Sequence, residues 1–146
     1  MAPSETMTGR APDAAERELW QAARAVAARA YARYSGLHVG AALRAEGGAV
    51  YLGVNVENAS YPAGMCAERA ALAAAVTAGE RRFTALAVAT ERNDAILPCG
   101  ACLQALSEFG ELEVVAVPPG GDPVEPRVLA LRDLLRAPFQ SPRDLP

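Results

Sequence analysis

The segment Pro98-Cys99-Gly100-Ala101-Cys102 carries two of the chain's three cysteines, directly after a predicted strand and loop and at the start of a predicted helix. The third cysteine, Cys66, lies 33 positions before Cys99 (99 − 66) in Cys66-Ala67-Glu68, where another helix is predicted to begin. The partial positive charge of a helix N-terminus lowers thiol pKa values and favours the thiolate, which is the form that binds zinc. The three cysteines therefore predict a zinc site assembled from two helix N-termini.

The fourth position of such a site decides its role. Structural zinc sites have four protein ligands, here with His38 or a carboxylate as the fourth, whereas catalytic sites leave that position to water. Side chains two positions apart on a helix do not share a face, so Glu68 is poorly placed to bind zinc beside Cys66 and is free to act as a general base on a bound water. Inert buried cysteines would not explain why the cysteines lie at two helix starts. A redox-active Cys-x-x-Cys pair would not require a glutamate two residues after Cys66. We therefore favour a catalytic metal.

Composition narrows the class of protein. With 146 residues, 51% of them hydrophobic, the chain can bury the core of one domain. It has no lysine, which excludes Schiff-base and pyridoxal-phosphate enzymes and a Walker A loop, and its one histidine limits His-dependent nucleophiles. The net charge is −3 and the arginines are scattered, so no basic patch for nucleic acid is visible. We expect a small-molecule substrate.

Location is predicted from the same features. No apolar run approaches the roughly 20 residues of a membrane span, and residues 1–10 lack the apolar core of a signal peptide. We therefore expect a cytoplasmic protein without a membrane partner. An odd number of cysteines in that compartment does not suggest disulfides.

The order of predicted elements indicates an α/β fold. A capping box at Asp13 and Glu16 begins a helix that we expect to reach about Tyr34. A hairpin of strands Val39–Ala45 and Val50–Val54 follows, and later elements alternate between helix and strand. These later elements are expected as a helix over 66–78, a strand over 84–90, a helix over 99–109, a strand over 112–117, an extended piece near 128 and a helical turn over 131–135. We predict one domain over 1–146, a three-layer α/β/α sandwich around a mixed five-stranded sheet, with 1–12 flexible and 136–146 irregular.

Several ordered motifs resemble one family. They are Tyr34-Ser35, Val39-Gly40-Ala41-Ala42-Leu43, Asn55-Val56-Glu57-Asn58-Ala59-Ser60-Tyr61-Pro62, Cys66-Ala67-Glu68-Arg69, Pro98-Cys99-Gly100-Ala101-Cys102 with Gln104, and the ending Pro138-Phe139 … Pro142-Arg143-Asp144-Leu145. The general signature of zinc deaminases is a His or Cys, any residue and Glu, followed later by Pro-Cys-x-x-Cys. From about Tyr31 to Leu145 the chain is similar to the cytidine deaminase family, specifically its small homotetrameric type with a three-cysteine zinc site.

The resemblance implies an activity and a cofactor. The reaction is hydrolysis of cytidine or 2′-deoxycytidine to uridine or 2′-deoxyuridine and ammonia, in pyrimidine salvage. Cys66, Cys99 and Cys102 would hold one Zn²⁺ per chain, zinc-bound hydroxide would attack C4, and Glu68 would shuttle protons. Two alternatives stay open: a deaminase of a modified cytosine nucleoside such as a blasticidin-type antibiotic, and a non-catalytic zinc-binding module of the same fold.

The resemblance also implies substrate contacts. Asn55 and Glu57 match positions that bind the sugar hydroxyls, Ala67 would offer its backbone N–H to the base, and Phe139 matches an aromatic that reaches a neighbouring subunit's site. Arg69 and Gln104 would lie next to the metal ligands, and the assembly would be a homotetramer.

Two positions depart from the family pattern. Leu37 stands where the family usually has a phenylalanine that packs on the base, so we expect the base to be held more loosely. Leu103 stands where an arginine usually follows Cys102. Because Leu103 is four positions after Cys99, we expect it to lie over that sulfur without compensating its charge, which would leave a bound water less acidic. Alternatively, Arg44 or Arg92 supplies the charge in space.

Overall fold

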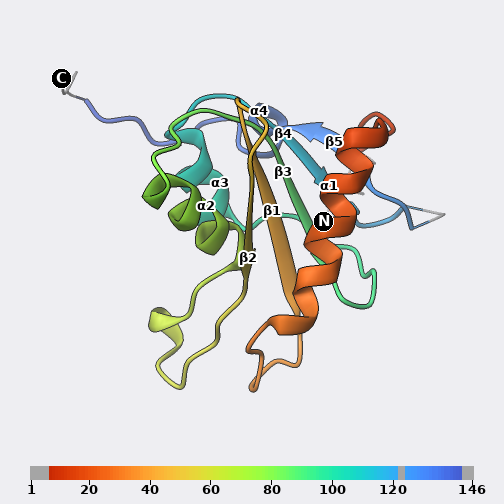
Figure 1. Cartoon of the computed structure of the whole chain (residues 1–146), viewed down its shortest axis with the longest axis vertical. Helices are drawn as coiled ribbons and strands as arrows, with labels where there is room; N and C mark the ends of the chain where they lie inside the picture. Colours follow the sequence, from red (N-terminus) through yellow and green to blue (C-terminus); the bar gives the residue numbers. More distant parts are fainter. Residues whose placement is uncertain (1–6, 122–123, 143–146) are drawn as a thin grey trace.

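A single five-stranded sheet organises the chain in the computed structural model, which describes residues 7–121 and 124–142. Its order is β2-β1-β3-β4-β5, with β3 and β4 parallel and the other neighbours antiparallel (Figure 1). The strands are β1 (Val39–Ala45), β2 (Val50–Val54), β3 (Phe83–Thr90), β4 (Glu113–Ala116) and β5 (Arg127–Ala130). The predicted mixed sheet is confirmed.

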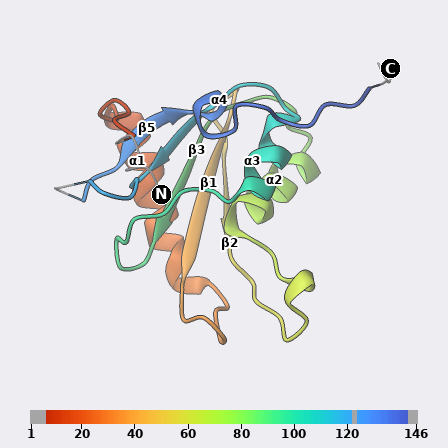
Figure 2. The same cartoon turned by 180° about the vertical axis from the view of Figure 1, so that it is seen from behind.

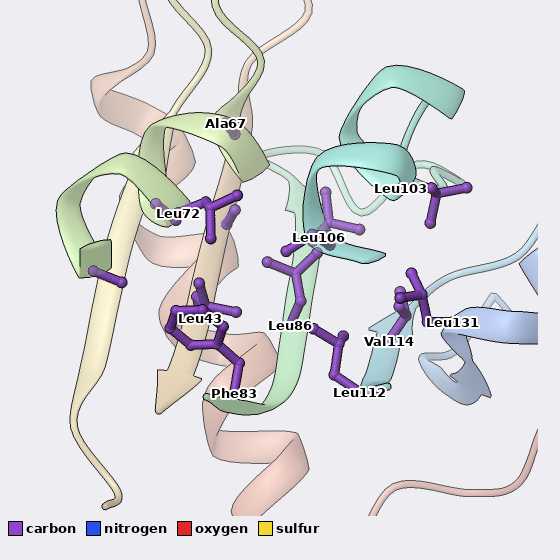
Figure 3. Packing of buried hydrophobic residues seen from close by; sticks show 14 of the residues in the cluster. Leu43, Ala67, Leu72, Phe83, Leu86, Leu103, Leu106, Leu112, Val114 and Leu131 are labelled. Atoms are coloured by element: carbon purple, nitrogen blue, oxygen red, sulfur yellow. The ribbon is translucent and has the colours of Figure 1, made fainter. Parts of the chain in front are cut away.

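Helices cover both faces of this sheet (Figures 1 and 2). Helix α1 (Ala14–Val26) packs on one face, where Leu19 and Trp20 join a buried cluster with strand alanines and valines. Helices α2 (Ala67–Thr77) and α3 (Gly100–Ser107) pack side by side on the other face, over a larger aliphatic cluster, and the short α4 (Leu131–Leu134) follows β5 (Figure 3). The three-layer arrangement is therefore as predicted. Within the described ranges, no helix has the length and apolar character needed to cross a membrane.

The first helix ends earlier than the sequence pattern predicts. Helix α1 stops at Val26, a 3₁₀ turn covers Ala27–Arg29, and the chain is extended at Ala30. The backbone of Tyr31 then bonds to the loop after β2, donating to the Asn55 carbonyl (3.0 Å) and accepting from the N–H of Glu57 (2.8 Å). The expected helix to Tyr34 is wrong because these tertiary hydrogen bonds outweigh a helical apolar periodicity. The other predicted elements begin and end within two residues of the observed bounds.

Glycines end the two helices that carry the cysteines. Gly79 after α2 and Gly110 after α3 have φ values of 97° and 96°, in the left-handed region where an L side chain is strained. These stops were predicted from sequence, and they fix the lengths of α2 and α3.

The described part of the N-terminal segment is tied to the sheet. Arg10 pairs with Val128 through two backbone hydrogen bonds of 3.1 and 2.8 Å, so the segment expected to be flexible adds a bridge beside β5. The Arg10 guanidinium also holds both carboxylate oxygens of Glu16, at 2.6 and 2.8 Å. Residues 1–6 lie outside the described residues.

We expect Glu16→Gln to lower the free energy of unfolding at pH 7 by about 1 kcal/mol, because it removes the charge from a buried carboxylate that pairs with Arg10. Glutamine keeps the hydrogen bond to the Asp13 N–H that completes the capping box. The hydrogen bond from Arg10 lowers the pKa of Glu16. Its stabilisation is therefore present above the ordinary glutamate pKa of about 4.3 and is lost as the pH falls through the folded-state value.

Urea unfolding at pH 7 and at pH 3 measures this difference. The gap between the two proteins should shrink at low pH, and Glu18→Gln, at an exposed position of the same helix, should change stability little at either pH. A gap of equal size at both pH values would mean that packing, rather than charge, is responsible.

Candidate active site

The three cysteines meet at the adjoining N-termini of α2 and α3. Cys66 is the N-cap of α2, Cys99 is the N-cap of α3 and Cys102 lies in the first turn of α3. Their sulfurs all lie within 4.8 Å of one another, and the Cys66 and Cys99 sulfurs are 4.0 Å apart. Tetrahedral zinc with Zn–S bonds of about 2.3 Å would place its sulfurs about 3.8 Å apart. The three ligands therefore fit zinc without rearrangement of the helices.

No fourth protein ligand joins this cluster among the described residues. His38, the candidate from sequence, instead pairs through Nδ1 with Glu91 at 3.1 Å. A donor set of three thiolates with one position left over is the kind found in catalytic zinc sites.

Arg69 supplies positive charge to the thiols. Its Nη2 atom lies 3.9 Å from the Cys66 sulfur, and hydrogen bonding to Cys66 and then to Cys102 raises the pKa of the guanidinium further. Cys102 is fully buried, and this burial raises the pKa of its thiol. A buried thiolate at Cys102 therefore needs cations beside it, and the guanidinium and a metal ion would provide them.

Glu68 lies in the first turn of α2, beside the sulfur cluster, and lines one cavity together with Cys66. Its side chain is only 4% exposed, and its Oε2 atom accepts a hydrogen bond from the Cys102 thiol at 3.5 Å. Burial raises the pKa of this carboxyl group above its ordinary value. A raised pKa brings a carboxyl group closer to neutral pH, which favours a role in general acid–base catalysis.

A cavity of about 220 Å³ opens onto these groups. Its polar wall contains Glu68 with Cys66 and Cys99. Its remaining walls are mainly aliphatic and come from Leu37, Val39, Ile96 and Leu97. Val39, Ile96 and Leu97 were not predicted from the sequence as wall residues. The signal for Ile96 and Leu97 is an apolar pair inside a loop, directly before the Pro-Cys motif.

Asn55 and Glu57 reach the site but also hold its loops. The Asn55 amide accepts from the Val39 N–H and donates to the Leu37 carbonyl, both at 2.8 Å. Glu57 Oε1 accepts from the N–H groups of Tyr34 (3.0 Å) and Ser35 (3.1 Å), and the bond from Ser35 contributes most to lowering the pKa of this carboxylate. Both residues also line a second cavity of about 400 Å³, which adjoins the first at Asn55 and Cys66.

The other predicted contact residues divide into two groups. Leu37, 44% exposed, and Ala67, the first residue of α2, line the smaller cavity. Phe139 is 76% exposed and is not among the residues that line its own chain's cavity. Gln104, expected beside the metal ligands with Arg69, instead uses both ends of its amide on the backbone of Phe139.

Leu103 is buried in the core. It is 6% exposed and belongs to the aliphatic cluster that also contains Leu106 and Leu131 (Figure 3). The Leu103 side chain is therefore part of the core, and its position over the Cys99 sulfur stays a prediction. Replacing Leu103 by arginine would bury a charge in that core, so it is not a clean test of how acidic a bound water is. That acidity stays a prediction.

Two other arginines were considered as sources of the positive charge that Leu103 does not supply, and the structure gives each of them a different partner or location. Arg44 donates from Nε to Thr84 Oγ1 at 2.9 Å. Arg92 lines a separate cavity of about 170 Å³ together with His38 and Asp94. Arg69 is accordingly the arginine that the structure places against the sulfurs.

Fold and site together define a zinc-dependent enzyme of the hydrolase class, with a buried glutamate beside a three-cysteine metal site. Residues 14–117 match the family described as the cytidine and deoxycytidylate deaminase zinc-binding region. This match covers more than half of the chain, and the chain belongs to that family.

Individual relatives agree with this assignment. The chain is 45% identical to the cytidine deaminase of Sporosarcina psychrophila over 104 residues, which are 70% of this chain and 76% of that relative. Over 91 residues, 62% of each chain, it is 47% identical to a probable cytidine deaminase of Dictyostelium discoideum. Among solved structures, the cytidine deaminase of Burkholderia pseudomallei is 46% identical, with a TM-score of 0.75 over 84% of this chain and 98% of that one. The cytidine deaminase of Mycobacterium tuberculosis is 39% identical, also with a TM-score of 0.75, over 88% of this chain and 100% of that one.

Proposed function

We propose that this protein is a zinc-dependent deaminase that hydrolyses cytidine and 2′-deoxycytidine to uridine and 2′-deoxyuridine, releasing ammonia. The single observation that carries this proposal is the buried Glu68 carboxyl group, which faces the cavity at the edge of the three-sulfur cluster. A structural zinc site needs no such carboxyl group, so a non-catalytic module of the same fold would leave Glu68 without a purpose.

The protein's own groups account for the proton transfers. Zinc, when bound by Cys66, Cys99 and Cys102, would lower the pKa of a water and so make a nucleophile available at neutral pH. Glu68 accepts the proton of that water and delivers it to N3 of the pyrimidine as the new C4–O bond forms. It then takes the remaining proton from the new C4 hydroxyl group and transfers it to the exocyclic amino group. The C4–N bond breaks with ammonia as the leaving group, and the C4–O bond becomes the carbonyl of the uracil product. The aliphatic cavity walls keep bulk water away and maintain the raised pKa of Glu68.

Backbone and loop groups would orient the nucleoside. Ala67 is the first residue of α2, where backbone N–H groups have no partner within the helix, and it lines the cavity. We assign its N–H to the base. Asn55 and Glu57 each keep hydrogen-bonding capacity beyond their bonds to the backbone, and we assign this capacity to the sugar hydroxyls.

The assembly proposed for the active form is a homotetramer. Exposed large apolar side chains gather on the loops beside the site, at Tyr31, Tyr34, Val56, Tyr61 and Met65. Isolated exposed apolar residues are ordinary, but five on two hydrogen-bonded loops favour an interface. We assign Phe139 of a neighbouring copy to the base, because aliphatic walls alone offer the pyrimidine no aromatic face for stacking.

An ammonia-release screen over cytidine, 2′-deoxycytidine, cytosine, CMP and modified cytosine nucleosides tests the assignment. Cytidine and deoxycytidine should be the best substrates, and light scattering should give the mass of four chains. A preference for CMP would contradict a nucleoside substrate. A preference for a blasticidin-type nucleoside would favour the second candidate, for which the aliphatic Leu37 at the cavity is the supporting observation.

Two further proposals concern the cell rather than the site. A role in pyrimidine salvage follows from the proposed reaction. A cytoplasmic location is consistent with three unpaired cysteine thiols, which a reducing compartment preserves.

A further inference from the structure

The C-terminal segment is fastened to the helix that carries two of the three cysteines. Gln104 on α3 donates from Nε2 to the Phe139 carbonyl oxygen (2.9 Å) and accepts at Oε1 from the Phe139 N–H (2.8 Å). One side-chain amide thus bonds both polar backbone groups of one residue, as a partner strand does in an antiparallel pair. In Figures 1 and 2 the blue C-terminal segment passes α3 and then leaves the body of the molecule.

These two hydrogen bonds fix the backbone of Phe139 and so limit the directions that its side chain can take. The bonded N–H and carbonyl groups lie on either side of the Phe139 Cα atom. The residue before it is Pro138, whose ring fixes its own φ angle. Leu135, four positions earlier, packs against the core, so the segment is held at both ends. Yet the Phe139 ring is 76% exposed. Ordering a chain segment costs conformational entropy, and here the ordered segment leaves a large apolar ring in water.

We propose that Gln104 is a positioning residue, which holds the Phe139 backbone against α3 and thereby aims the Phe139 ring at the base-binding cavity of a second copy of this chain. This inference rests on the proposed function, which supplies the neighbouring cavity and the base. Gln104 itself touches no substrate in this arrangement. Each α3 helix then contributes to two sites. It carries Cys99 and Cys102 of its own site, and through Gln104 it holds the Phe139 ring that completes the site of the neighbouring chain.

Replacing Gln104 by methionine, which has a similar length but no hydrogen bonds, tests the proposal. We expect the KM for cytidine to rise about 5- to 30-fold, in the range of one lost aromatic stacking contact on a base. The value of kcat should change much less, because stacking holds the base equally in the ground state and in the transition state. Zinc content and the mass of the assembly should match those of the unaltered protein. Glu108→Met, which changes the exposed polar residue at the C-cap of α3, is the matched control and should leave KM unchanged.

A double-mutant comparison separates positioning from a general structural effect. Phe139→Ala should raise KM by a similar factor, and the variant with both changes should have no higher KM than Phe139→Ala alone. Additive increases, or an unchanged KM in either single variant, would overturn the proposal.

Hydrogen exchange gives a readout that does not depend on turnover. The Phe139 amide should exchange slowly in the unaltered protein and much faster in Gln104→Met. Equal rates would show that the hydrogen bonds between Gln104 and Phe139 do not form in solution. If the unaltered protein released no ammonia from any cytosine nucleoside, the proposed function and the inference resting on it would both fail. In that case faster exchange in Gln104→Met would still establish the hydrogen bonds themselves.

Discussion

Replacing Glu68 by glutamine should reduce kcat for cytidine by at least ~10³-fold, within the range attributed to positioned general acid–base groups. Glutamine has nearly the same shape as glutamate, but it cannot take up or release a proton. The substitution also removes the cost of ionising a carboxyl group that is 4% exposed, so the protein should not lose stability. Ammonia release, zinc analysis and thermal unfolding of the same preparations measure the three effects.

A cysteine variant provides the contrast. Cys102→Ser should lose both zinc and activity, because the hydroxyl group is a poor replacement for a buried thiolate ligand. Glu68→Gln should lose activity alone. Substantial turnover by Glu68→Gln with zinc bound would contradict the assignment of Glu68 as the proton carrier.

Replacing Gly53 by alanine should lower the free energy of unfolding by about 3 kcal/mol and weaken zinc binding at the same time. Gly53 lies on β2, where the backbone of α2 approaches the strand closely. A Cβ atom there would collide with the Ala67 carbonyl oxygen and the Ala71 amide nitrogen. These are backbone atoms and cannot rotate away, so α2 must shift as a unit, which places the cost at or above the usual range for overpacking. Cys66 and Glu68 belong to the same helix end and would move with it.

Chemical unfolding and a zinc competition assay measure the two consequences. Gly47→Ala is the matched control, because a Cβ atom at Gly47 meets nothing within 4 Å, and it should change neither quantity. If the free energy of unfolding fell as expected but the zinc affinity did not change, α2 would be shown to shift without disturbing its N-terminus.

Local chemistry made much of this fold predictable. The hairpin strands match their predicted bounds, because two short apolar, strand-forming runs and the glycine-containing turn between them act within a few residues. The cysteines and Glu68 could be assigned to one site because each lies at a predicted helix start, where the partial positive charge of the helix favours a thiolate.

Long-range contacts were not predictable in the same way. The end of α1 depends on backbone bonds between Tyr31 and a loop more than twenty residues later. The burial of Leu103 in one cluster with Leu131 depends on the packing of α3 near α4, which the spacing of residues along α3 does not indicate. Gln104 pairs with a residue 35 positions away, and no local pattern records that pairing.

Cysteine at both helix starts has a consequence for how the protein responds to metal. Helix N-termini are usually closed by a Ser, Thr, Asp or Asn side chain that accepts a backbone hydrogen bond, but neither Cys66 nor Cys99 makes such a bond. A zinc ion bound by both Cys66 and Cys99 would therefore link the N-termini of α2 and α3 and stabilise these two helix ends in place of side-chain caps. Chelation should loosen the first turns of both helices, on one face of the sheet, and leave α1 on the opposite face tightly packed. The amount of bound metal could then be followed from the local order of α2 and α3 compared with that of α1, under conditions in which the protein stays folded.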